Sequence, residues 1–123
     1  TYINSPDHLN ADFSYKADPK LFFAGQMTGV EGYVESAASG LLCALHMHRK
    51  LCGKALAIPA NICVLGALSA HISGANQNFT PMNANFGILK AGDRRIRDKK
   101  ARYTYLASRS LGYIAGYKLL IKD

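Results

Sequence analysis

The sequence predicts an α/β fold in which a short buried strand is followed by helices and a mostly helical tail. Two observations support this. A brief apolar run at 21–24 leads into a stretch punctuated by glycines, and apolar side chains then recur at helical spacing through much of the remaining chain. With 123 residues, about half of them apolar, the chain is expected to form a single segment with a core of its own.

The first nineteen residues are expected to form an irregular lead-in. Turn-forming residues occur at Asn4-Ser5-Pro6-Asp7 and again at Asp18-Pro19. The strand follows at Leu21–Ala24, where the apolar run is too short for a helix.

Three glycines lie within eight residues after the strand, at Gly25, Gly29 and Gly32. They precede a predicted helix, so free backbone N–H groups at its start can meet an anion or the polar edge of a cofactor. Glycine also lets a bulky ligand approach the backbone closely. A tight strand-to-helix turn that binds nothing explains the local pattern equally well.

The helix after this turn is expected from about Gly32 to Leu51, with Gly53 as its stop. Five residues at helical spacing are expected to face the sheet: Val34, Ala38, Leu41, Leu45 and His48.

Two more helices are predicted, at about Pro59–Ser73 and Arg97–Ile121. Gly74 ends the first of them. The second is expected to bury one side, made by Tyr103, Leu106, Ser110 or Leu111, Ile114 and Tyr117. Between the two helices, Asn78–Leu89 is predicted to be a structured loop whose phenylalanine and methionine side chains belong to the core.

Positive charge is concentrated in the second half of the chain. The formal net charge is +7, yet residues 1–53 contain four Lys/Arg and five Asp/Glu, whereas residues 54–123 contain eleven and three. This asymmetry favours a polyanionic partner such as RNA. Arg95, Lys99 and Arg102 share one side of the last helix and are the candidate phosphate contacts; a solvated helix surface is the alternative.

Other classes of protein are disfavoured. The first twenty residues are polar and no apolar run approaches the ~20 residues that cross a bilayer, so a cytoplasmic protein with no membrane partner is expected. Three cysteines are too few for a disulfide framework. Cys43, His46, His48 and Cys52 would point to different sides of a helix, so no metal site is predicted.

Two blocks resemble a known family. Residues 21–42, with their Ala24-Gly25-Gln26 turn, resemble the second flavin-contacting segment of the folate- and FAD-dependent tRNA (uracil-5-)-methyltransferase family, and the related glucose-inhibited division protein A family shares that turn. Residues 78–89 contain Pro-Met-Asn-Ala-Asn-Phe-Gly, which resembles the next segment of the methyltransferases and favours them over the division protein. The basic helix beginning at Arg94 also fits the family.

This resemblance implies the C-terminal part of a Rossmann-like FAD-binding domain. Residues 1–19 would be the lead-in, 20–53 the flavin-contacting strand–turn–helix unit, and 54–123 the helical, basic tail. The sequence contains no Gly-x-Gly-x-x-Gly after a strand, which a dinucleotide-binding half needs. The family's catalytic cysteines lie upstream of the matched region. We therefore expect a piece of a longer parent chain that is inactive alone, lacks catalytic residues and self-associates through its apolar edge.

The parent's implied activity is the formation of 5-methyluridine in tRNA or ribosomal RNA. The resemblance implies methylenetetrahydrofolate as the carbon donor, with FAD and NAD(P)H. Two alternatives stay open: a wobble-uridine modification protein of the division protein A type, and a non-catalytic basic RNA-binding module.

The candidate cofactor-binding residues cluster at the glycine turn: Gly25, Gln26, Thr28, Gly29, Val30, Glu31 and Tyr33. Gln26 matches a flavin-contacting glutamine of the wider family, and its amide can bond the edge of a flavin ring. Tyr33 can stack on a planar ligand or simply pack at the helix start. Glu31 can accept from a pterin N–H or favour the helix dipole. Asn83 and Asn85 are expected to pack their loop over this turn.

Overall fold

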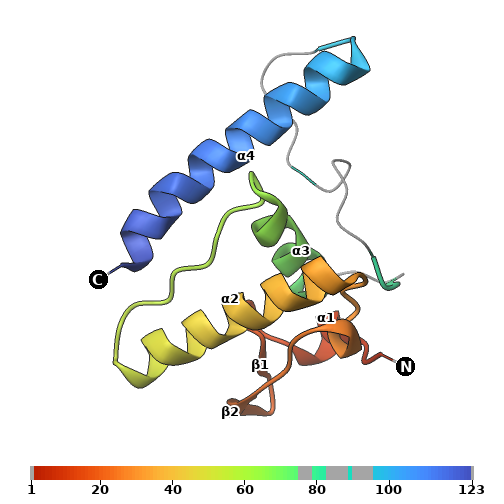
Figure 1. Ribbon diagram of the computed structural model, residues 1–123. Coiled ribbons are helices and arrows are strands. Elements are labelled where there is room, and N and C mark those ends of the chain that lie inside the picture. The colour runs from red at the N-terminus through yellow and green to blue at the C-terminus, as the bar shows by residue number, and fades with distance from the viewer. Residues whose placement is uncertain (1, 75–78, 83–88, 90–95, 123) are drawn as a thin grey trace.

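The computed structural model describes residues 2–74, 79–82, 89 and 96–122. Over these residues the order of elements is α1 (Ser5–His8), β1 (Ser14–Tyr15), β2 (Asp18–Phe22), the 3₁₀ turn η1 (Gln26–Thr28), α2 (Tyr33–Leu51), α3 (Val64–Ser73) and α4 (Lys99–Ile121). The described part is thus α/β and mostly helical, as predicted. The hairpin and α1 lie on one side of α2, and α4 lies beyond α3 (Figure 1).

The strand differs from its prediction. It begins at Asp18, ends at Phe22 and pairs antiparallel with β1. Most of β2 is exposed, Leu21 included, so a buried strand at 21–24 was wrong. The reason is that a two-stranded antiparallel hairpin leaves much of its surface in water, whereas the apolar run suggested a strand covered on both faces.

The lead-in is more ordered than expected. Ser5–His8 form a single helical turn with proline in its first turn, where the missing N–H costs nothing. The Ser5 hydroxyl donates to the carbonyl oxygen of Thr28 at 2.6 Å, so α1 is attached to the glycine turn. The prediction of an irregular lead-in was therefore wrong at α1 and β1.

Helix α2 confirms its predicted bounds. Gly32 is its N-cap, and Gly53 follows with a φ of 69°. The N–H of Gly53 donates to the carbonyl of Lys50, and the N–H of Lys54 donates to the carbonyl of Arg49. This is the Schellman pattern that ends helices at glycine.

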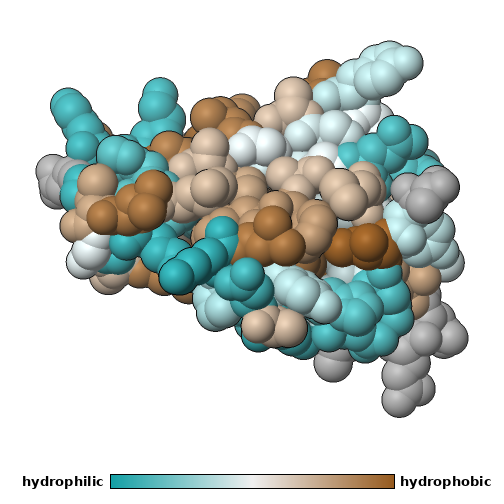
Figure 2. Space-filling view, turned by 90° about the horizontal axis from the view of Figure 1, so that it is seen from below, coloured by the Kyte–Doolittle hydropathy of each residue, from teal (hydrophilic) through white to brown (hydrophobic). Residues whose placement is uncertain are grey.

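The buried face of α2, however, is not the one predicted. Ser39, Leu42, Cys43 and His46 are buried, whereas Val34 and Leu41 are 80% and 64% exposed. The helix is oriented by the hairpin region, since the Ser39 hydroxyl accepts from the N–H of Gly25 at 2.9 Å and Phe13 packs edge-on against His46. Apolar surface is exposed elsewhere too, since Figure 2 shows a band of it across one face of the molecule.

Helix α3 starts five residues later than predicted, at Val64. The sulfur of Cys63 caps it by accepting from the N–H of Gly66 at 3.4 Å. Pro59 instead lies in a connection without regular structure, and a side chain at Gly66 would overlap the carbonyl of Ala60. The predicted end at Gly74 is confirmed.

Helix α4 holds that connection in place. The Tyr117 hydroxyl donates to the carbonyl of Ala57 at 2.6 Å, and the N–H of Ala60 donates to the Tyr113 hydroxyl at 2.8 Å. Leu106 and Tyr117 are buried as predicted, whereas Leu111 is exposed. Asp98 caps the helix by accepting from the N–H of Ala101 at 2.9 Å, which offsets the cost of the cations that follow.

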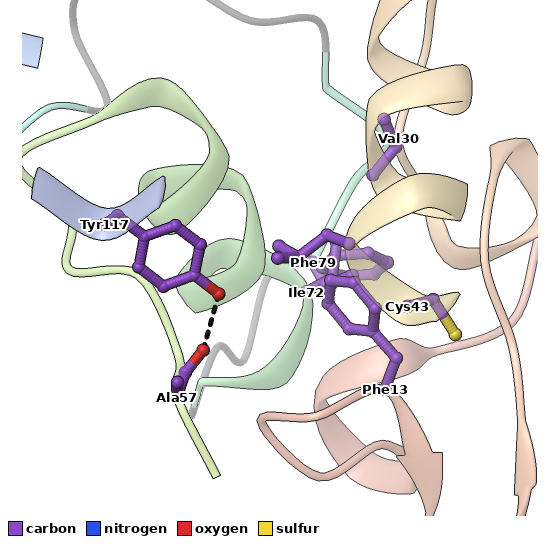
Figure 3. Packing of buried hydrophobic residues seen from close by; sticks show 8 residues of the cluster. Phe13, Val30, Cys43, Ala57, Ile72, Phe79 and Tyr117 are labelled. Atoms are coloured by element: carbon purple, nitrogen blue, oxygen red, sulfur yellow. Dashed lines mark hydrogen bonds between the residues drawn. The ribbon is translucent and has the colours of Figure 1, made fainter. Parts of the chain in front are cut away.

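The main core joins side chains from distant parts of the chain (Figure 3). The ring of Phe13 lies beside Ile72 and Phe79, and Val30 and Cys43 border the same cluster. Phe79 confirms the prediction that this block supplies core side chains.

His46 is a polar residue of this core. Its ring is fully buried, and neither of its nitrogens has a hydrogen-bond partner. Burial lowers the pKa of His46 from its ordinary value, against the raising effect of Asp12 and together with the lowering effect of Arg49.

We expect stability to fall as the pH decreases below about 6.5, the ordinary histidine pKa. The unfolded chain binds a proton there that folded His46 resists, so protonation favours unfolding until the folded pKa is reached. One such group changes the free energy of unfolding by at most about 1.4 kcal/mol per pH unit. The measurement is urea unfolding from pH 7.5 to 5. His46→Leu should flatten the pH dependence, and His48→Leu, at an exposed site, should leave it unchanged. An identical slope in wild type and His46→Leu would refute this account.

Candidate functional site

The glycine turn is closed by its own backbone. Gly25, Gly29 and Gly32 have φ values of 81°, 96° and 99°, which side chains rarely adopt. The Thr28 N–H and hydroxyl both donate to the carbonyl of Gly25, at 3.0 and 2.7 Å. The N–H of Gly29 donates to Gln26 at 3.0 Å. These bonds hold the turn in one conformation.

The two sequence blocks meet at this turn. The N–H of Met82 donates to the carbonyl of Gly29 at 2.8 Å, and the N–H of Glu31 donates to that of Met82 at 3.0 Å. Val30 and Met82 thereby form a parallel bridge. The prediction that the second block packs over the turn is confirmed for Met82, whereas Asn83 and Asn85 lie outside the described residues.

Gly29 is required by packing rather than by an approaching ligand. A side chain there would overlap the far end of the Phe79 ring. Gly25 differs, because nothing lies within 4 Å of the position its Cβ would take. Among the three glycines, Gly25 is therefore the one that leaves open space beside the backbone.

A cleft of about 260 Å³ opens beside the turn, lined by Gln26, Gly32, Tyr33 and Ser36. The Tyr33 side chain is 98% exposed, and Gln26 is exposed as well. The structure thus brings together the two side chains whose chemistry most favoured a flavin.

Electrostatics of the cleft favour a neutral ring edge over a phosphate. Gly32 has no side chain to cap the first turn of α2, so amide N–H groups begin the helix beside the cleft. The Glu35 carboxylate lies so close to Gly32 that a side chain there would overlap it. This negative charge at the helix start opposes an anion.

The other predicted site residues support the turn or lie at its rim. Thr28 and Val30 are both buried. The Thr28 hydroxyl donates to the carbonyl of Gly25, and Val30 packs in the core. Glu31 is exposed and bonded to Met82 through its N–H. Gly32 was noted in the sequence as a turn glycine but was not proposed as a site residue, and Ser36 was missed, although it lies one helical turn after Tyr33.

The basic cluster lies at the start of α4. The Lys99 ammonium and the Arg102 guanidinium lie 5.5 and 5.6 Å from the centre of the Tyr103 ring. Both cations are exposed, so they can contact a polyanion without being desolvated first. Arg95, the third predicted contact, lies outside the described residues.

The cysteines offer little for nucleophilic chemistry. Burial raises the pKa of the Cys43 and Cys63 thiols, which disfavours their thiolates. Cys52 is exposed, with its sulfur 3.8 Å from His48 Nε2. In the described ranges no three His, Cys, Asp or Glu side chains gather as a metal site, and no helix has the length and apolar character to span a bilayer.

Comparison with known proteins finds relatives along almost the whole chain. The family model of glucose-inhibited division protein A matches residues 1–55. Methylenetetrahydrofolate–tRNA-(uracil-5-)-methyltransferases TrmFO of Staphylococcus aureus strains JH9, Newman and N315 are 48% identical over 120 residues, or 96% of this chain. Over nearly its whole length the chain is therefore similar to these methyltransferases. It spans 28% of the length of these relatives, so it corresponds to a part of such a protein.

This similarity confirms the resemblance inferred from the two blocks. The family model ends near Gly53, whereas the methyltransferase match continues through the Pro-Met-Asn block and α4. The second block therefore falls inside the methyltransferase match.

We expect Gly29→Ala to destabilise the chain by about 2–4 kcal/mol, through backbone strain and overlap with Phe79. Gly25→Ala is the matched control, with positive φ but open space, and should cost about 1–3 kcal/mol. Unfolding free energies from urea titrations would measure both. Adding Phe79→Ala should relieve part of the Gly29→Ala penalty. Strict additivity of the two substitutions would contradict the overlap.

Proposed function

We propose that this chain forms one wall of the flavin site in an FAD-dependent enzyme that makes 5-methyluridine in tRNA. Methylenetetrahydrofolate would donate the carbon, and NAD(P)H would supply reducing equivalents. The observation that carries the proposal is the cleft in which Gln26 and Tyr33 meet beside a turn bonded to the second block. The names of the relatives, which specify methylenetetrahydrofolate and tRNA uracil, support it.

The residues present fit the ring of a flavin rather than its pyrophosphate. Open space at Gly25 and the cleft beside Gln26 can receive a planar group. Flavin supplies hydride and electron transfer when bound. The amide of Gln26 would bond its polar edge, and Tyr33 would cover its face or that of the folate. Glu31 would accept from a pterin N–H.

Gly25, Thr28, Gly29 and Val30 would act through the turn's backbone, which their bonds and packing hold in shape. No catalytic residue is assigned to this segment. A Rossmann-like FAD-binding domain would be completed by the remainder of the parent chain, and a cytoplasmic location remains a prediction.

The basic start of α4 would contact the RNA backbone. Lys99 and Arg102 are held near one ring and are exposed, and Arg95 is proposed with them from the sequence. Such contacts position RNA without reading its sequence.

One alternative retains specific support. The division protein A family model matches residues 1–55, so a wobble-uridine modification enzyme shares the glycine turn. The longer methyltransferase match favours the first proposal, and analysis of the modified nucleoside distinguishes the two.

Replacing Gln26 by Ala should weaken FAD binding about fivefold, the loss of one hydrogen bond of about 1 kcal/mol. The full-length enzyme for this test carries the present segment in place of its counterpart in the S. aureus methyltransferase. Flavin content and FAD titration are the measurements. Tyr33→Ala should perturb the flavin absorption spectrum, while Tyr105→Ala on α4 serves as control. Unchanged FAD affinity and spectrum in both cleft variants would remove these residues from the site.

Replacing both Lys99 and Arg102 by Gln should weaken tRNA binding by the same enzyme. If each contacts a phosphate, the slope of log affinity against log salt should flatten by about 1.4–1.8 in total. Lys118→Gln with Lys122→Gln, at the other end of α4, controls for total charge. Equal slopes for the two double variants would indicate that the Lys99–Arg102 surface does not contact RNA.

A further inference from the structure

Ser39 joins the two walls of the cleft beside the glycine turn. One wall is the η1 turn, which contributes Gln26, and the other is the start of α2, which contributes Tyr33 and Ser36. The Ser39 hydroxyl accepts from the N–H of Gly25 at 2.9 Å and donates to the carbonyl of Ser36 at 2.9 Å. One side chain therefore bonds the residue before Gln26 to a residue of the opposite wall.

The bond from Gly25 to Ser39 holds a position where glycine provides no packing of its own. The φ of 81° and ψ of −158° at Gly25 lie in a region that essentially only glycine adopts, and nothing lies within 4 Å of the place its Cβ would take. Thr28 holds the carbonyl of Gly25 through its N–H and its hydroxyl. The N–H of Gly25 is held by Ser39. The direction in which the chain enters Gln26 thus depends on both bonds.

The surroundings of Ser39 provide a matched control. Ser39 is 5% exposed, so its two bonds are shielded from solvent. A small void of about 10 Å³ borders its side chain, and Ser69 of α3 lines the same void. Ser69 is 2% exposed, but its hydroxyl donates at 2.8 Å to the carbonyl of Leu65 in its own helix. The two serines have similar environments, and only Ser39 connects the walls of the cleft.

We propose that Ser39 is a positioning residue of the flavin site, whose hydroxyl sets the separation and orientation of Gln26 and Tyr33. Ser39 does not line the cleft and acts through Gly25 and Ser36. The inference rests on the proposed function, because it concerns binding in the same cleft. A ligand held between two walls binds more tightly when the walls are spaced for it beforehand, since little reorganisation then opposes binding.

Double-mutant cycles test this role in the full-length enzyme that carries the present segment. Ser39→Ala should weaken FAD binding about tenfold, because the walls are no longer ordered before binding, whereas Ser69→Ala should change it less than about twofold. If Ser39 acts through Gln26, Gln26→Ala should have little further effect in the Ser39→Ala enzyme and its full effect in the Ser69→Ala enzyme. Ser39→Thr keeps the hydroxyl, and the void beside it leaves room for a methyl group. It should restore both the FAD affinity and the flavin absorption spectrum.

Two results would overturn the proposal. The first is additivity of Ser39→Ala and Gln26→Ala in FAD affinity, and the second is an equal loss of affinity in Ser39→Ala and Ser69→Ala. Urea unfolding of each variant measures how far its stability has changed. If Ser39→Ala does not fold, Ser39→Cys replaces it in the cycle, because a thiol is a weaker donor and acceptor than a hydroxyl.

Amide hydrogen exchange separates this inference from the proposed function. The N–H of Gly25 should exchange at least about tenfold faster in Ser39→Ala than in wild type or Ser69→Ala, with or without FAD, because its hydrogen bond is lost. If Gly25 exchanges faster but Gln26→Ala and Tyr33→Ala leave FAD binding unchanged, the flavin assignment fails and the role of Ser39 in shaping the cleft stands. Unchanged exchange at Gly25 would overturn the inference even where FAD binding depends on Gln26.

Discussion

The fold depends on the backbone ladder between Gly29, Met82 and Glu31. Two hydrogen bonds join a turn near residue 30 to a segment some fifty residues later, and the Phe79 ring lies against Gly29 beside them. Closing so long a loop costs entropy that local turn bonds cannot offset. Burial of Phe79 with Phe13 and Ile72 provides the compensating apolar contact. The turn and the second block are therefore one structural unit, although neither is complete in the sequence alone.

The inner side of this unit is buried and holds the turn in place, whereas its outer side is exposed. On its inner side, Thr28 and Val30 are buried and Ser5 and Ser39 bond the turn's backbone. On its outer side, Gln26 and Tyr33 are free of the core and border the cleft. A rigid turn with exposed polar side chains is suited to orienting a planar ligand, because its donors need little reorganisation on binding. Glu35 limits the charge of that ligand by occupying the helix start.

Local signals allowed good prediction of α2, because a glycine precedes it and Gly53 supplies the left-handed residue that ends it. Periodicity did not identify its buried face, since apolar residues occur on two sides. Pro59 suggested a helix start, but Cys63 caps α3 and Tyr113 holds the preceding connection. These outcomes depend on partners distant in sequence. At the site, Gln26 was predicted from the family motif and Tyr33 from the stacking chemistry of its ring, whereas the overlap that a side chain at Gly29 would have with Phe79 required the tertiary structure.

The two halves of helix α4 have different surroundings. Its C-terminal half is anchored by Tyr113 and Tyr117, whose hydroxyls bond the connection before α3. Its N-terminal half bears exposed cations around Tyr103. Exposed charges contribute little to folding, whereas a buried hydrogen bond such as that of Tyr117 contributes about 1 kcal/mol. Substitutions at the basic end can therefore alter charge without releasing the helix from the core.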